Sequence, residues 1–234
     1  MKNQLAASIF LSCMLAGCAT PGKNTLDTNA SAPIVVHNEI TVNQPYQQVW
    51  DKLVRGLSKS YYMINNIDKE SRIINLSFSS TLPQEYVDCG STERTYTNRG
   101  VTETFKYKTA ASSRFKLASS IQSDPVSNYY LDINRTSSLE GRISVYLAPE
   151  QGDNTKTHVV VNTFYILSIT NSGNVFRESL SGRILSSTFI PNTPPTKIKF
   201  NTGNPSQFTW TEGVTSTCSS NGKSENDILD ILQN

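Results

Sequence analysis

The sequence predicts an α+β fold, in which a curved, mostly antiparallel sheet packs against one long helix and a short helix ends the chain. Apolar residues follow Pro45 at helical spacing, and several later segments alternate between apolar and polar residues as strands do. A short apolar run, again at helical spacing, closes the sequence. Residues 34–234 have a length suited to a single domain of this kind.

The first 17 residues are typical of a secretory signal. Lys2 supplies a basic start, and the apolar run that follows is shorter than the roughly 20 residues of a permanent membrane span. The run ends in Leu15-Ala16-Gly17-Cys18, which resembles the lipobox of bacterial lipoproteins. That resemblance implies a signal peptide at 1–17, cleavage before Cys18, and acylation of Cys18 with chains such as palmitate. The alternative is an ordinary cleaved signal in which Cys18 falls near the cut by coincidence.

The compartment follows from the same resemblance. In that family Ala19, rather than Asp, after the cysteine points to the outer membrane. The domain is expected on the periplasmic face, with the cell surface as the alternative. The net charge of +2 and the low content of charged residues, 17%, argue against a nucleic-acid partner. The predicted location is therefore the cell envelope, with the membrane as one partner.

Cys89 and Cys218 are predicted to form a disulfide. Cys13 belongs to the signal and Cys18 would carry lipid, so these two remain as a pair in an oxidising compartment. A reactive thiol at Cys89 is the alternative, but no His lies near it in the sequence.

Residues 18–33, after the signal, are predicted to be the lipidated cysteine and a flexible tether. From Thr20 onward the segment is rich in Pro, Gly, Asn and Thr, and it has too little apolar surface to order itself. Strands are then predicted at 34–42, 62–67 and 72–79, the last two joined by a turn at 68–71.

A helix is predicted to start at Asn43 and Pro45 and to end near Lys59. Asn is a good N-cap, and Pro is tolerated in the first turn. Its apolar face consists of Val49, Trp50, Leu53, Val54 and Leu57. Trp50 is interpreted as a core residue.

This strand–helix–hairpin stretch resembles outer-membrane assembly lipoproteins of the BamC type. The resemblance depends on Pro45, Tyr46, Trp50, Tyr62, Ile64 and Asp68. It implies a helix-grip-like fold, in which the long helix closes a curved sheet.

The remaining chain is mostly strand-like. Alternation predicts strands at 102–108, 129–133, 143–147 and 159–166. Residues 119–127 are predicted to be a polar loop, residues 175–189 a helix, and the segment after Ser224 a short C-terminal helix. Residues 191–206 contain several prolines and are predicted to be a long loop. Lys197, Lys199 and Phe200 are its candidate partner contacts, with a solvated loop as the alternative.

No enzymatic motif is present in the sequence, and no cofactor or metal is expected. His37 and His158 lack metal-binding spacing, and Asp68 and Glu70 belong to a predicted turn. We therefore expect a lipid-anchored structural or assembly protein that docks on an envelope complex of the secretion or barrel-assembly type. The alternative is a module that binds a lipid or a small amphiphile in a cleft beneath Trp50.

Overall fold

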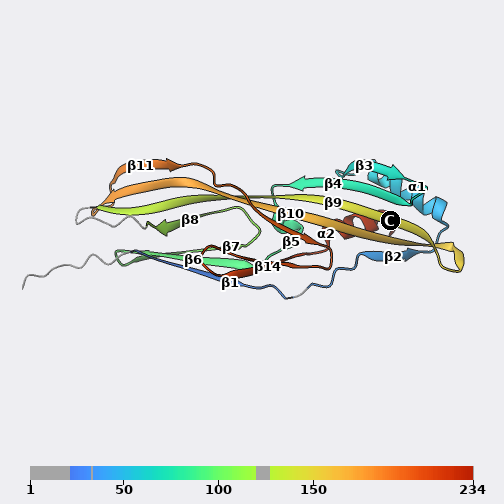
Figure 1. Cartoon of the computed structure of the whole chain (residues 1–234), viewed down its shortest axis with the longest axis horizontal. Helices are drawn as coiled ribbons and strands as arrows, with labels where there is room; N and C mark the ends of the chain where they lie inside the picture. Colours follow the sequence, from blue (N-terminus) through green and yellow to red (C-terminus); the bar gives the residue numbers. More distant parts are fainter. Residues whose placement is uncertain (1–21, 33, 120–126, 234) are drawn as a thin grey trace, which may run out of the picture.

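The structure is a computed structural model that describes residues 22–32, 34–119 and 127–233. Two very long strands, β9 (Ser127–Glu150) and β10 (Asp153–Ser179), form an antiparallel hairpin. At about 3.3 Å per residue, the 24 residues of β9 span about 80 Å. Figure 1 shows this hairpin running through the whole elongated molecule.

The other elements are shorter. The strands are β1 (Lys23–Asn29), β2 (Glu39–Val42), β3 (Met63–Asp68), β4 (Ile73–Ser80), β5 (Val87–Asp88), β6 (Ser91–Asn98), β7 (Val101–Lys108), β8 (Ser113–Ala118), β11 (Ile184–Ile190), β12 (Thr196–Asn201), β13 (Ser206–Thr209) and β14 (Thr215–Ser220). The helices are α1 (Tyr46–Leu57), the short 3-10 helix η1 (Pro83–Glu85) and α2 (Lys223–Gln233).

Several shorter strands pair with the two long strands in an eight-stranded sheet. The outer side of β10 pairs in turn with β2, β12 and β11 along its length. The outer side of β9 pairs with β8 and β4, and β3 then pairs with β4. The register of the β9–β10 pair is continuous except for one shift near Asp153, so the hairpin forms a single framework.

The helices cover one half of this framework. Val49 and Leu53 of α1 and Ile228 of α2 are fully buried, as are Val161 and Leu167 of β10. We call this half the helix end. The opposite end, at the turns of residues 99–100 and 180–183, we call the turn end; β11 starts there (Figure 1).

The predicted α+β, helix-grip-like fold is wrong. The protein is 61% strand and 13% helix, and α1, with 12 residues, shares its role with α2, with 11, rather than closing the sheet alone. The helical pattern of α1 ends at Leu57, since polar residues follow it directly. The strand–helix–hairpin order, the antiparallel sheet and the short C-terminal helix are present, and Trp50 is a core residue with 4% exposure.

Three other predictions need correction. Residues 175–189 are not a helix, because they form the end of β10, a turn and most of β11. Residues 191–206 are not an open loop, because they contain β12. Lys23–Asn29, predicted to belong to a flexible tether, instead pairs with β6 as β1. The predicted signal peptide, Cys18 and most of the predicted loop at 119–127 lie outside the described residues.

A second layer lies beside the hairpin. It consists of the sheet β1-β6-β7 and the small sheet β13-β14-β5. In the part of the chain that the structure describes, no helix is both long and apolar enough to cross a membrane.

Candidate docking surface

Strand β11 forms an exposed edge of the large sheet. It pairs with β10 on one side, and no other described strand pairs with its outer side. Ile184, Leu185 and Phe189 are 44%, 47% and 67% exposed. The strand contains no charged residue and no Pro, the residues by which sheet edges are usually protected from pairing. A bulge beside Leu185 is its one irregularity, so most of the edge is open to a further strand.

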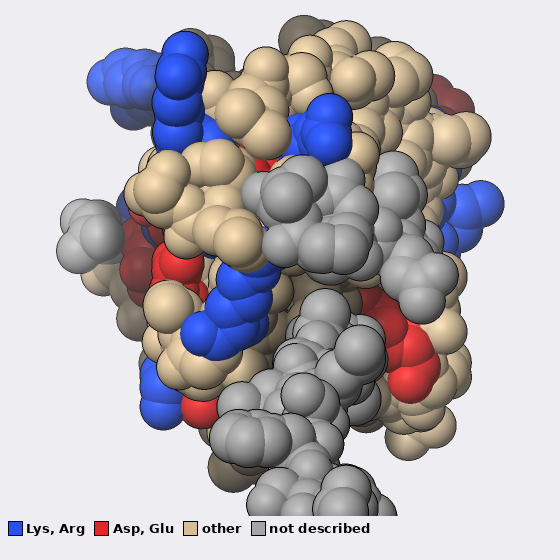
Figure 2. All heavy atoms as spheres, turned by 90° about the vertical axis from the view of Figure 1, so that its left-hand side faces the viewer, with Lys and Arg blue, Asp and Glu red and all other residues tan. Residues whose placement is uncertain are grey.

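The turn end adds exposed apolar residues next to this edge. Val101, after the β6–β7 turn, is 60% exposed, and Leu180, in the β10–β11 turn, is 63% exposed. A cleft of about 330 Å³ lies between these turns, and an ion pair of Lys116 with Glu103 (2.6 Å) lines it. Figure 2 looks onto this end, where Lys and Arg side chains project beside broad uncharged areas.

The helix end contains a buried carboxylate. Glu225, in the first turn of α2, is fully buried and accepts hydrogen bonds from the hydroxyls of Tyr165 (2.9 Å) and Thr202 (2.5 Å). Ser220 (3.2 Å) and Ser224 (3.1 Å) donate to its other oxygen. Burial raises the pKa of Tyr165, which therefore stays a neutral donor. The cluster is sealed from solvent, and its role is to hold α2 against β10, β12 and β14.

A second polar cluster lies at the surface of the same end. The hydroxyls of Tyr61 (3.0 Å) and Tyr62 (3.1 Å) donate to Asp227, and Lys223 forms an ion pair with Asp227 at 2.9 Å. Burial raises the pKa of both tyrosines, so they remain protonated at neutral pH. The cluster fastens α2 to the residues just before β3.

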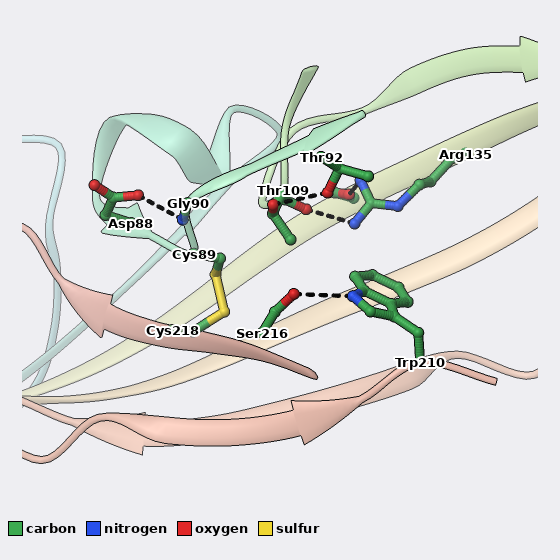
Figure 3. Close-up of a disulfide and its surroundings, with 10 residues drawn as sticks. Asp88, Cys89, Gly90, Thr92, Thr109, Arg135, Trp210, Ser216 and Cys218 are labelled. Carbon is green, nitrogen blue, oxygen red and sulfur yellow. Dashed lines mark hydrogen bonds between the residues drawn. A yellow bond between two sulfur atoms is a disulfide. The ribbon is translucent and has the colours of Figure 1, made fainter. Parts of the chain in front are cut away.

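Two links fasten the β13–β14 hairpin to β6 and to the residues just before it. The predicted disulfide between Cys89 and Cys218 is present, and both cysteines are buried (Figure 3). Arg94 of β6 forms an ion pair with Glu212 at 2.8 Å. Together these links connect the C-terminal strands to the middle of the chain.

Arg135 of β9 is a buried cation that the sequence analysis missed. It donates to the carbonyl oxygens of Thr109 (2.6 Å) and Ala111, and its guanidinium lies 5.5 Å from the ring of Trp210 and 5.6 Å from that of Tyr107. Figure 3 shows its side chain reaching from β9 toward Thr109, with the ring of Trp210 nearby. Burial lowers its pKa to about 10. Arg135 stands at one of the alternate positions of β9 whose side chains are buried, and this alternation is the sequence signal for its burial.

The predicted partner contacts on residues 191–206 are divided between surface and core. Lys197 and Lys199 are exposed on β12, whereas Phe200 is 4% exposed and stacks on Tyr165 with 5.2 Å between ring centroids. Phe200 therefore belongs to the core and is not available to a partner.

The core beneath Trp50 is filled by side chains. Val49, Leu53 and Leu57 around it are at most 1% exposed, and the clefts found among the described residues near α1 are lined by other residues. This packing lends no support to an amphiphile cleft at that position.

Within residues 22–32, 34–119 and 127–233, no three His, Cys, Asp or Glu side chains come together to hold a metal ion. His158 of β10 lies 3.5 Å from the carboxylate of Glu39, as part of a surface pair.

No family model, curated protein or solved structure matches this chain. The resemblances to bacterial lipoproteins and to the BamC type therefore stay predictions.

Proposed function

We propose that this chain is a lipid-anchored, non-enzymatic structural or assembly protein of the bacterial envelope. In this proposal it is attached to the outer membrane through Cys18 on the periplasmic side, and it docks on a larger envelope complex of the secretion or barrel-assembly type. The observation that carries the proposal is the uncharged, exposed edge of β11 at one end of a long hairpin. An open edge of this kind is a template for pairing with another chain.

The position of β1 supports an anchor at the turn end. Lys23 pairs with Thr97, close to the β6–β7 turn. Five residues of fully extended chain reach roughly 18 Å, so an acylated Cys18 would lie within that distance of Lys23. The exposed edge and the attachment point would then share one end of the molecule, beside the bilayer.

The disulfide is consistent with this location. Disulfides persist in oxidising compartments such as the periplasm, so the Cys89–Cys218 bridge supports a location in such a compartment. Two or three acyl chains on one cysteine hold a protein on a bilayer, whereas one chain binds only marginally.

The proposal is tested by fractionation and co-purification of the full-length protein. Cys18→Ser should move the protein from the membrane to the soluble fraction, and crosslinked wild type should co-purify with a larger envelope complex. Leu180→Asp, at the turn end, should reduce that co-purification. The matched control is Leu82→Asp, which changes a leucine of 49% exposure elsewhere on the surface. A membrane-bound Cys18→Ser variant, or crosslinked wild type that co-purifies with no larger complex, would refute the proposal.

A further inference from the structure

The residues of β11 are symmetric in chemical type about their centre. The strand reads Ile-Leu-Ser-Ser-Thr-Phe-Ile, with Ser187 in the middle. Counting outward from Ser187, each residue has a counterpart of the same class. The counterparts are Ser186 with Thr188, Leu185 with Phe189, and Ile184 with Ile190.

We propose that β11 pairs antiparallel with β11 of a second copy of this chain, about a two-fold axis at Ser187. A two-fold interface brings the same patch of both subunits together, so the patch must be complementary to itself. In this register each hydroxyl residue lies opposite a hydroxyl residue and each large apolar residue opposite another. Such cross-strand pairs stabilise a sheet, whereas like charges directly opposite each other destabilise it.

The absence of charge favours a second copy over an unrelated strand. A charged residue near the centre of a self-paired strand would face its own copy, and β11 has no charged residue along its length. A partner strand recognised by charge complementarity would instead require charged residues on this edge. The proposal rests on the proposed function in one respect, namely that the exposed edge of β11 pairs with another chain. A second copy takes this edge, and the larger complex is then contacted through the exposed apolar residues of the turn end, Val101 and Leu180.

The backbone of β11 is regular at the centre of the proposed pair. The ladder to β10 is regular from Gly173–Ile190 to Arg177–Ser186, and the shift occurs at Leu185. The central pairs of the proposed register therefore lie in regular strand. Among the described residues no side-chain hydrogen bond engages Ser187, and its neighbours on both faces are exposed.

The size of the edge predicts a weak dimer in dilute solution. A strand of seven residues buries less than the 1,200–2,000 Å² typical of stable complexes. On a bilayer the two copies share a surface, which raises their effective concentration and favours pairing. The antiparallel arrangement places the two turn ends on opposite sides of the axis, roughly 35 Å apart at about 3.3 Å per residue. Both lipid anchors then reach one bilayer when the dimer lies along it.

The register is tested by disulfide trapping of the full-length protein in its native membranes. In the proposed pair, Ser187 lies opposite Ser187 of the second copy, with Cα atoms about 4.5–5.5 Å apart, which is within disulfide range. Thr188 lies opposite Ser186, so two Thr188 residues are diagonal neighbours at roughly 7–8 Å, which is too far. Under mild oxidation, Ser187→Cys should form a covalent dimer at least about tenfold faster than the matched control Thr188→Cys.

A second pair of variants tests the interface without new cysteines. Ser187→Lys places a lysine opposite itself and should abolish dimers captured by an amine-independent crosslinker. Ser79→Lys, which changes an exposed serine of β4, should leave those dimers unchanged.

Several outcomes would overturn the pairing. They are equal trapping rates for Ser187→Cys and Thr188→Cys, a trapped band whose mass matches another protein, and dimers that persist in Ser187→Lys. These readouts concern copies of this chain alone, so a negative result leaves the docking on a larger complex intact. Loss of co-purification with that complex would likewise leave the trapped dimer unaffected.

Discussion

Replacing Tyr165 by Phe tests whether the buried cluster around Glu225 holds the helix end together. The Tyr165 hydroxyl contacts both carboxylate oxygens, at 2.9 and 3.0 Å, and also lies 3.0 Å from the hydroxyl of Ser220. Its ring stacks on Phe200, and that contact remains in the variant. The change therefore removes one hydroxyl and leaves the apolar packing as it is.

The expected loss of stability follows from the charge of the acceptor. Glu225 is fully buried, and none of the ion pairs among the described residues involves it, so hydroxyl donors and the start of α2 stabilise its carboxylate. A hydrogen bond to a charged group contributes about 1.5–3 kcal/mol, roughly twice the value for neutral partners. We expect Tyr165→Phe to lower the free energy of unfolding by about that amount. For a protein of this size the melting temperature should fall by roughly 3–12 °C.

The measurement is urea denaturation of the purified protein followed by circular dichroism, with the disulfide intact. The midpoint should fall while the slope of free energy against denaturant stays the same, because the surface exposed on unfolding does not change. Tyr46→Phe is the control, since its hydroxyl donates to the Lys69 carbonyl at 3.2 Å in an exposed position. This control should lower the free energy of unfolding by less than about 0.5 kcal/mol. A loss of less than about 0.5 kcal/mol in Tyr165→Phe would show that this hydroxyl does not stabilise a buried carboxylate.

Three further predictions concern the disulfide, the Arg94–Glu212 ion pair and the core residue Phe200. Replacing Cys89 and Cys218 by Ala opens a loop of 129 positions, for which the chain-entropy model gives about 5 kcal/mol; an unchanged urea midpoint would contradict this. Burial acts to raise the pKa of Glu212, but the hydrogen bond and charge of Arg94 hold it below the usual 4.5. The stabilisation from this pair is present above pH 4.5 and is lost as the pH falls through the lowered pKa, so Glu212→Gln should lose less stability than wild type between pH 6 and pH 3. An equal loss in both proteins would count against the pair. Phe200→Ala should cost about 3–5 kcal/mol in the same denaturation assay, and a cost below about 1 kcal/mol would mean that Phe200 is not a core residue.

The first hairpin and α1 could be predicted from the sequence because their signals are local. The apolar face of α1 and the alternation on both sides of the turn after Asp68 depend on residues close together in the chain. The disulfide could be predicted by counting, since two of the four cysteines fall in the N-terminal segment. These features can be predicted without knowing which distant strands pair.

The long strands could not be predicted from alternation alone. The patterns at 129–133 and 143–147 indicate separate strands, yet both belong to β9, which continues between them through polar residues. Polar residues in this stretch are tolerated because β8 and β4 pair with its edge and because buried groups such as Arg135 find carbonyl partners across the layers. Such long-range pairing leaves no local trace in the sequence.

The segment 175–189 shows how the two periodicities can be confused. Phe176, Leu180 and Ile184 recur every four residues, as on a helix face. In the structure they belong to β10, a turn and β11, and the spacing is a coincidence of one turn between two strands. The turn itself had a local signal in Gly182, which adopts a positive φ of 83°. The hydroxyl and apolar residues that follow it favour an exposed strand.

The distribution of the core along the hairpin explains why the exposed edge, the proposed docking surface, lies at the turn end. In the half covered by the helices, alternate residues of β10 such as Val161 and Leu167 are fully buried, and the polar groups there are closed into the Glu225 cluster. Toward the turn end the residues of β10 are only partly buried, and β11 exposes nearly all of its residues. An edge strand with so little core of its own derives its order from the hairpin, whose other half is fixed by α1 and α2. The helix end therefore supplies the stability and leaves the turn end free to present a pairing edge.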